Sequence, residues 1–212
     1  MIEIVPAIIA KTYEKFEAMV RKVEPFTERV SLDISDGVFT PTSTIKGYPE
    51  LLKIETPLKF DVHLMIKQPS EQMSNWYKTK ADRYFVHIEE NYDIKSLLEQ
   101  IKYNNKKVGL VLNPETRTEE AIEFIDLIDY IQFMTVQPGF YGRVFVEEVL
   151  DKISSFHEHY PGIPIAVDGG INPETGKKAI CSGASILVSG SYIFNSPSVG
   201  EAVNKLKETI CI

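Results

Sequence analysis

Short apolar runs rich in β-branched residues alternate with longer amphipathic stretches along the whole chain, and this alternation constrains the fold more than any other feature. The runs have the length of strands, whereas the stretches between them repeat apolar residues at helical spacing. Strands are predicted over 2–9, 29–34, 58–64, 83–88, 107–112, 130–135, 163–168 and 184–188. Helices are predicted over 12–24, 48–54, 70–79, 93–104, 117–127, 144–159, 173–181 and 198–209. Eight strand–helix units predict an α/β fold, a (βα)8 TIM barrel forming a single domain over residues 1–212.

Composition limits the class of partner. The chain has 212 residues and a net charge of −7, and it contains no basic run that could track a phosphate backbone, so we expect no nucleic-acid partner. No apolar stretch reaches the roughly 20 residues that span a bilayer, and the N-terminus is typical of a first strand and not of a signal peptide. We therefore expect a cytoplasmic protein without a membrane partner. Cys181 and Cys211 are expected to be free thiols.

Ionisable residues follow several of the predicted strands. Asp33 ends the second strand, His63 ends the third and Asp168 ends the seventh. His87 and Glu89 alternate at the end of the fourth strand, so they share one face of it. Because a parallel barrel carries its active site at the C-terminal ends of its strands, these side chains predict an active site there.

Glycine-rich turns follow the last three strands. Glycine lets a backbone approach an anion closely, and a helix N-terminus adds a partial positive charge, so these turns predict a phosphate site. A short helix starting at Ser191 would contribute such an N-terminus. The predicted phosphate-binding residues are Gly139, Phe140, Tyr141 and Gly142 after the sixth strand, Gly169 and Gly170 after the seventh, and Gly190 and Ser191 after the eighth.

Five segments together resemble one known family, and the match runs from about Pro6 to Phe194. They are DVHLM at 61–65, NP at 113–114, MTVQPGF at 134–140, VDGGIN at 167–172 and SGSYIF at 189–194. In order and spacing they resemble ribulose-phosphate 3-epimerase and its relatives that act on ketohexose 6-phosphates. The resemblance implies an isomerase with a TIM barrel that inverts C3 of a phosphorylated ketose. The first candidate substrate is D-ribulose 5-phosphate. It also implies a homo-oligomer.

The resemblance also assigns roles to residues. Asp33 and Asp168 match the acid/base pair that flanks C3, one removing a proton and the other returning one to the opposite face. Both carboxylates and His63 match ligands of a divalent metal, zinc, manganese or iron. His63 also lines the substrate pocket by this resemblance, as do Met65 and Met134, which match positions that cap the site with polarizable apolar surface.

Several residues depart from the family pattern, and three of these departures bear directly on metal or substrate binding. Ser31 stands where the family has a second metal-binding histidine, Ser35 replaces a methionine of the pocket, and Ala7 replaces a serine that contacts substrate. Because a hydroxyl is a poor ligand for these metals, three possibilities stay open. The remaining three ligands hold the metal, the site works without a metal, or the barrel performs different chemistry or none.

Two function classes follow from these observations. The first is a ketose-phosphate 3-epimerase, which the retained Asp33 and Asp168 favour. The second is a divergent phosphosugar-binding barrel with another substrate, such as a ketohexose 6-phosphate, or without epimerase activity, which Ser31 favours. Arg143 is a further candidate, because its charge could add to a phosphate contact.

Overall fold

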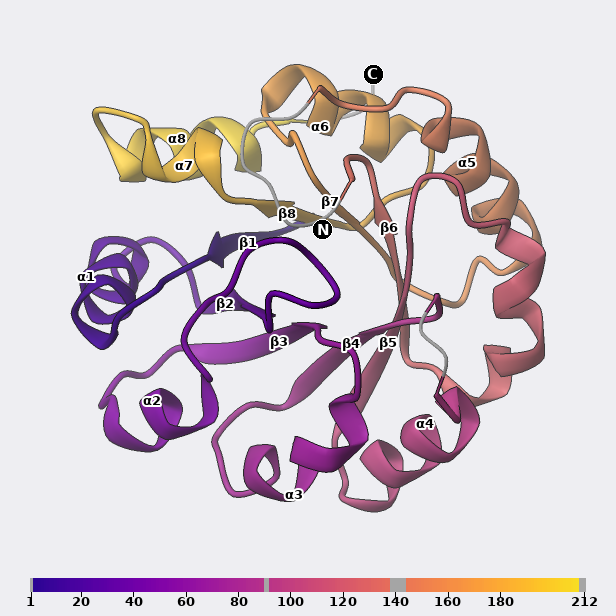
Figure 1. Ribbon diagram of the computed structural model, residues 1–212. Helices are drawn as coiled ribbons and strands as arrows, with labels where there is room; N and C mark the ends of the chain where they lie inside the picture. The colour runs from indigo at the N-terminus through magenta and orange to yellow at the C-terminus, as the bar shows by residue number, and fades with distance from the viewer. Residues whose placement is uncertain (1, 90–91, 138–143, 210–212) are drawn as a thin grey trace.

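Eight parallel strands close into a barrel in chain order (Figure 1). The computed structural model describes residues 2–89, 92–137 and 144–209. Each strand pairs with the next along the chain, and β8 pairs with β1 to close the ring. The predicted barrel is therefore confirmed. Its strands are β1 (Glu3–Ile8), β2 (Arg29–Ser35), β3 (Lys59–Met65), β4 (Arg83–His87), β5 (Lys107–Leu112), β6 (Tyr130–Met134), β7 (Ile165–Asp168) and β8 (Ile186–Ser189).

Helices surround the ring of strands and cover its outer face (Figure 1). Their apolar stripes pack on the outward-facing strand residues, as Phe16, Val20 and Val23 of the first helix show by their complete burial. None of the helices in the described part of the chain is long and apolar enough to cross a membrane. The helices are α1 (Tyr13–Val23), α2 (Tyr48–Lys53), η1 (Pro69–Gln72), α3 (Met73–Trp76), α4 (Ile94–Tyr103), η2 (Thr118–Leu127), α5 (Val149–His159), α6 (Pro173–Cys181), α7 (Ser191–Phe194) and α8 (Val199–Lys207).

The segment after β5 forms a 3₁₀ helix, η2, where an α-helix was predicted over 117–127. Ala121 and Phe124 are buried and Leu127 packs partly against the core, so the inward-facing residues repeat every third position. A 3₁₀ helix has three residues per turn and aligns such positions in one stripe. The spacing of the apolar residues therefore fits the tighter helix.

Two other predicted helices are shorter than expected. The stretch before α5 does not form a helix, because the Val146 N–H donates to the Thr135 carbonyl at 2.8 Å and holds the segment beside β6. The predicted helix over 70–79 is divided into η1 and α3, and Thr79 closes it by donating its N–H and hydroxyl to the Trp76 carbonyl. Cys181, expected to be a free thiol, is disulfide-bonded, so that expectation was wrong.

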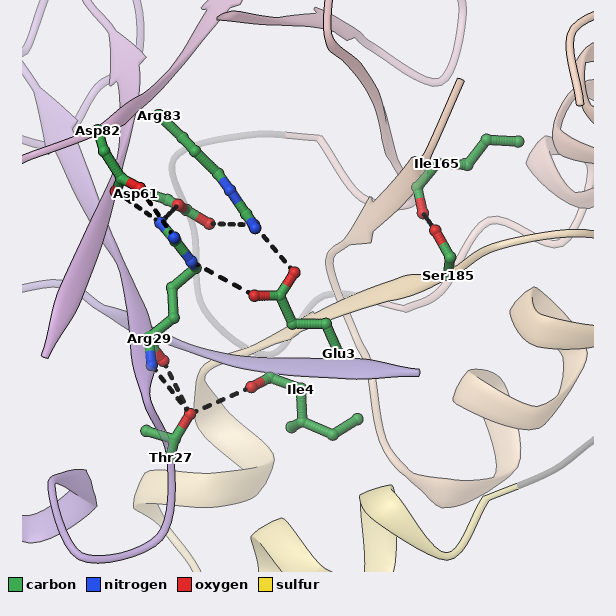
Figure 2. Close-up of polar contacts among 9 residues, drawn as sticks. All are labelled: Glu3, Ile4, Thr27, Arg29, Asp61, Asp82, Arg83, Ile165 and Ser185. Atoms are coloured by element: carbon green, nitrogen blue, oxygen red, sulfur yellow. Dashed lines mark hydrogen bonds and ion pairs between the residues drawn. The ribbon is translucent and has the colours of Figure 1, made fainter. Parts of the chain in front are cut away.

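The barrel interior is layered along its axis. At the N-terminal ends of the strands, Arg29 binds Asp61 at 2.6 Å and Asp82 at 2.7 Å, and Arg83 binds Glu3 at 2.9 Å (Figure 2). Above this ion network lies a compact apolar layer that fills the barrel, as is usual for this fold. Substrate chemistry is therefore confined to the C-terminal mouth. The apolar layer consists of Val5, Ala7, Phe85, Val111, Met134, Ala166, Ile186 and Val188.

Candidate active site

Strand β2 directs a column of polar side chains into the barrel. Ser31, Asp33 and Ser35 are all buried and lie two residues apart, so they share the inward face of the strand. The Ser31 hydroxyl donates a hydrogen bond to Asp33 Oδ1 at 3.1 Å. Ser31 therefore contacts the carboxylate directly, and its hydroxyl holds that oxygen in place.

Asp33, His63 and Asp168 meet in the C-terminal mouth, as the sequence predicted. The register pairs Asp33 with His63 across β2 and β3, and β7 brings Asp168 to the same imidazole. His63 Nδ1 lies 3.6 Å from Asp33 Oδ1 and 3.5 Å from Asp168 Oδ2. All three side chains are buried. Two carboxylates thus face a single buried imidazole.

The electrostatics of this cluster are set by burial and by mutual charge. Burial disfavours an imidazolium, yet the carboxylates of Asp168 and Asp33 outweigh burial and raise the pKa of His63 to about 9. Burial, with a smaller contribution from the charge of Asp33, raises the pKa of Asp168 above its ordinary value, while His63 opposes the shift. The cluster is therefore strongly attractive to a proton or to another cation.

The donor set fits a divalent metal. His63 Nδ1 is buried and has no hydrogen-bond partner in the described structure, and the carboxylate oxygens lie too far away for good hydrogen bonds. One ligand atom from each of Asp33, His63 and Asp168 lies within 4.8 Å of the others. Imidazole nitrogen and carboxylate oxygen suit zinc and manganese, and three protein ligands with an open fourth position are typical of catalytic zinc.

A second imidazole lies against the first. His87 Nε2 is 2.9 Å from His63 Nε2, and His87 Nδ1 is 3.0 Å from Glu89 Oε2. Burial lowers the pKa of His87 to about 4, although Glu89 opposes the shift. Alternation along the strand had indicated that His87 and Glu89 share a face and would line the pocket beside His63 if they point inward, but it did not assign either a chemical role. The contact between the two imidazoles was missed because it depends on how β3 and β4 pair.

The loops after β7 and β8 have the geometry that glycine supplies. Gly169 and Gly170 adopt φ values of +116° and +63°, and Gly190 precedes the short helix α7, which begins at Ser191 as predicted. A Cβ on Gly169 would lie 2.6 Å from Val136 Cγ2, so the close approach of the two loops requires glycine.

Other predicted site residues are placed as follows. Met65 and Met134 end β3 and β6 and are buried, and Met134 is part of the apolar layer. Ser35 shares hydrogen bonds with Thr40 and with the Thr42 carbonyl, so the pocket methionine of the family gives way to a cluster of hydroxyls. Gly139, Phe140, Tyr141, Gly142 and Arg143 lie outside the described residues.

Parallel barrels carry their chemistry at the C-terminal mouth, and the facing carboxylates make this chain a barrel enzyme suited to moving protons. The chain belongs to the ribulose-phosphate 3-epimerase family, whose model matches residues 3–194. It is thereby an isomerase of the ketose-phosphate 3-epimerase class.

Two curated relatives and one solved structure illustrate these likenesses. The cytoplasmic isoform of ribulose-phosphate 3-epimerase from Oryza sativa subsp. japonica is 32% identical over 98% of this chain and 94% of its own length. The ribulose-phosphate 3-epimerase of Bacillus subtilis is also 32% identical, over 98% of this chain and 99% of its own. The structure of 3-hexulose-6-phosphate synthase from Salmonella typhimurium has a TM-score of 0.75 at 16% identity and covers 98% of this chain and 97% of its own, which shows the shared fold.

Proposed function

We propose that this ketose-phosphate 3-epimerase interconverts D-ribulose 5-phosphate and D-xylulose 5-phosphate, with Asp33 and Asp168 as its two proton-transfer groups. The observation that carries the proposal is that both carboxylates approach one imidazole nitrogen from different strands, at 3.6 and 3.5 Å. Inversion at a carbon needs one group on each face, because the proton leaves from one side and returns on the other. The relatives are named ribulose-phosphate 3-epimerases, which supports a ribulose phosphate as the substrate.

The reaction is a pair of proton transfers at C3. One carboxylate removes the C3 proton, and the electron pair of the C–H bond forms the C2–C3 double bond of an enediolate while the carbonyl oxygen takes the negative charge. The other group, as a carboxylic acid, then returns a proton to the opposite face of C3. The roles of Asp33 and Asp168 exchange with the direction of the reaction. Ser31, by donating to Asp33 Oδ1 at 3.1 Å, restrains that carboxylate during the exchange.

A divalent metal fits the same residues. Asp33, His63 and Asp168 would hold it, and a bound zinc, manganese or iron ion supplies Lewis-acid polarisation of the sugar oxygens. The buried orphan nitrogen of His63 supports this assignment. Because Ser31 contributes no imidazole, we propose a site with three protein ligands, weaker than one with four.

The substrate phosphate is proposed to bind at the loops after β7 and β8. The positive φ values of Gly169 and Gly170 let the backbone turn closely toward an anion, and Gly190 with Ser191 begins α7 next to them in the barrel order. We further propose a homo-oligomer in the cytoplasm. The rice relative is a cytoplasmic isoform, which supports the cytoplasmic compartment.

The test is proton NMR of D-ribulose 5-phosphate with the purified protein in deuterated water, with added zinc or manganese and again with a chelator. The expected result is loss of the C3 hydrogen signal together with appearance of D-xylulose 5-phosphate, faster with metal than with chelator. Equal rates in both conditions would support a metal-free reaction. Absence of exchange in folded protein under both conditions would overturn the proposed substrate and favour the phosphosugar-binding barrel that Ser31 suggests.

A further inference from the structure

Two imidazoles lie edge to edge in the barrel mouth, and the second has no part in the proposed proton transfers. The Nε2 atoms of His63 and His87 are 2.9 Å apart, and their rings are inclined by only 19°. Each side chain is 1% exposed. At this distance one nitrogen must donate a proton and the other must accept it. The direction of this bond determines which nitrogen of His63 has a free lone pair.

Glu89 sets the direction of the hydrogen bond. Its Oε1 accepts from the Asn113 N–H at 2.6 Å and from the Thr116 hydroxyl at 2.6 Å, and its Oε2 lies 3.0 Å from His87 Nδ1. Burial opposes ionisation of Glu89, but its hydrogen bonds with His87, Asn113 and Thr116 outweigh burial and lower its pKa, so Glu89 is ionised and Oε2 also accepts. His87 therefore carries its proton on Nδ1 and, as a neutral ring, offers a lone pair at Nε2. The donor between the two imidazoles is then the Nε2–H of His63.

When His63 is a neutral ring, as metal ligation requires, this arrangement places its proton on Nε2 and leaves the Nδ1 lone pair unused. That atom is the buried nitrogen without a hydrogen-bond partner, and it faces Asp33 and Asp168. We propose that His87 and Glu89 are positioning residues that fix the tautomer of His63, so that its Nδ1 is free to ligate a divalent cation. The inference rests on one part of the proposed function, namely that Asp33, His63 and Asp168 hold a divalent metal.

The opposite tautomer would exclude the cation. If His87 carried its proton on Nε2, it would donate to His63, and the proton of His63 would occupy Nδ1 and point toward the two carboxylates. Removing the acceptor at His87 favours that form, because Asp33 and Asp168 attract an N–H. The dependence is strong in this chain, since Ser31 supplies no second imidazole and the metal would rely on His63 alone for nitrogen ligation.

The first test measures zinc affinity by competition with a chelator. His87→Leu removes the acceptor and is expected to weaken zinc binding about 10- to 100-fold. His87→Gln keeps an acceptor near the position of Nε2 and is expected to restore most of the loss. Phe39→Leu is the matched control, because the Phe39 ring packs on His87 at 4.5 Å without a hydrogen bond, and it should leave zinc affinity unchanged.

The second test needs no variant. Nitrogen-15 NMR of the zinc-loaded protein, with labelled histidine, reports the protonated nitrogen of each ring. We expect the proton of His63 on Nε2 and that of His87 on Nδ1. A proton on Nε2 of His87 would overturn the proposal, as would zinc affinity unaffected by His87→Leu, an equal loss in Phe39→Leu, or a wild-type protein that binds no zinc. If His87→Leu does not fold, the NMR measurement still decides.

These experiments can succeed or fail independently of the test of the proposed function. Zinc binding that depends on His87, without turnover of D-ribulose 5-phosphate, would keep this inference and reject the substrate. Turnover with zinc affinity independent of His87 would keep the substrate and reject the inference.

Discussion

Asp33 and Asp168 have the same functional group but different surroundings. Asp33 Oδ1 accepts a hydrogen bond from Ser31 at 3.1 Å, whereas burial raises the pKa of Asp168. Burial thus favours the protonated form of Asp168, whereas the Ser31 hydroxyl holds one oxygen of Asp33 in place. Such a difference between paired carboxylates is the usual basis for separate acid and base roles.

Replacing either carboxylate by its amide should stop interconversion, because one face of C3 then has no proton-transfer group. We expect Asp33→Asn and Asp168→Asn to lower kcat by about 10²- to 10⁴-fold. In each variant the remaining carboxylate can still remove the C3 proton of one of the two epimers. That epimer should therefore still exchange its C3 hydrogen in deuterated water. Asp36→Asn serves as a control. Asp36 directly follows β2, and every hydrogen bond described for its side chain comes from a backbone N–H group. A carboxylate variant that keeps a tenth of wild-type turnover would lose its assigned role.

The loop after β2 gives a prediction on pH. Asp36 accepts from the N–H groups of Lys67 and Val38 at 2.8 Å and of Phe39 at 2.9 Å. Partial burial opposes ionisation, but these bonds outweigh burial and lower the pKa of Asp36. Because its pKa is lower in the folded state, Asp36 stabilises the protein above its unfolded pKa of about 3.9, and this contribution is lost as pH falls through the folded pKa.

Asp36→Asn should therefore lower the free energy of unfolding at pH 7 by about 1 kcal/mol. This value is low for hydrogen bonds to a charged group, because the Asp36 side chain is exposed. The difference in Tm between wild type and variant should narrow as pH falls below about 4. Thermal unfolding measured from pH 7 to pH 2 checks this. A constant difference in Tm at all pH values would contradict it.

At the scale of the element, the turn from β7 into α6 next to the site depends on a backbone conformation that glycine adopts freely. Gly169, next to Asp168, has a φ of +116°, and a Cβ there would lie 2.6 Å from Val136 Cγ2 and 3.0 Å from Val136 N. Asn172 then caps α6 by accepting from the N–H groups of Glu174 and Thr175 at 2.8 and 3.2 Å. The strand can thus end on a carboxylate and turn sharply into a helix within a few residues.

Gly169→Ala should destabilise the protein by about 1–3 kcal/mol, because an L side chain is strained at this φ and collides with Val136. It should also lower epimerase activity by displacing Asp168. Gly162→Ala is the matched control: a Cβ there meets no atom within 4 Å, so its unfolding free energy should change by less than about 1 kcal/mol. Urea unfolding measures both. If the two variants had equal free energies of unfolding, the backbone conformation at position 169 would not require glycine.

At the scale of the whole molecule, the two ends of the barrel have different tasks. The N-terminal end holds β1 to β4 together through charges, as Arg29 contacts Glu3, Asp61 and Asp82 (Figure 2). The C-terminal end leaves a buried nitrogen without a partner and brings two carboxylates together. The first arrangement stabilises the fold, and the second leaves a place where a ligand can bind.

Arg29→Met should cost about 3 kcal/mol of unfolding free energy, because it leaves the buried Asp61 carboxylate with one fewer cation in a region shielded from water. Arg21→Met, in an exposed ion pair with Glu24 at 3.2 Å, is the control and should cost about 0.5 kcal/mol or less. Urea unfolding at pH 7 compares them. If the two variants were equally stable, the network would contribute no more than a surface ion pair.

The sequence by itself determined what depends on local spacing: eight strand–helix units, the glycine turns, and the placement of Asp33, His63 and Asp168 at strand ends. These follow from side-chain periodicity, which acts over a few residues. Tertiary structure alone decided what depends on strand register and packing. It set the contact of His63 with His87 and the Arg29 network. Each joins segments distant in sequence, or depends on their packing, so no local pattern could specify it.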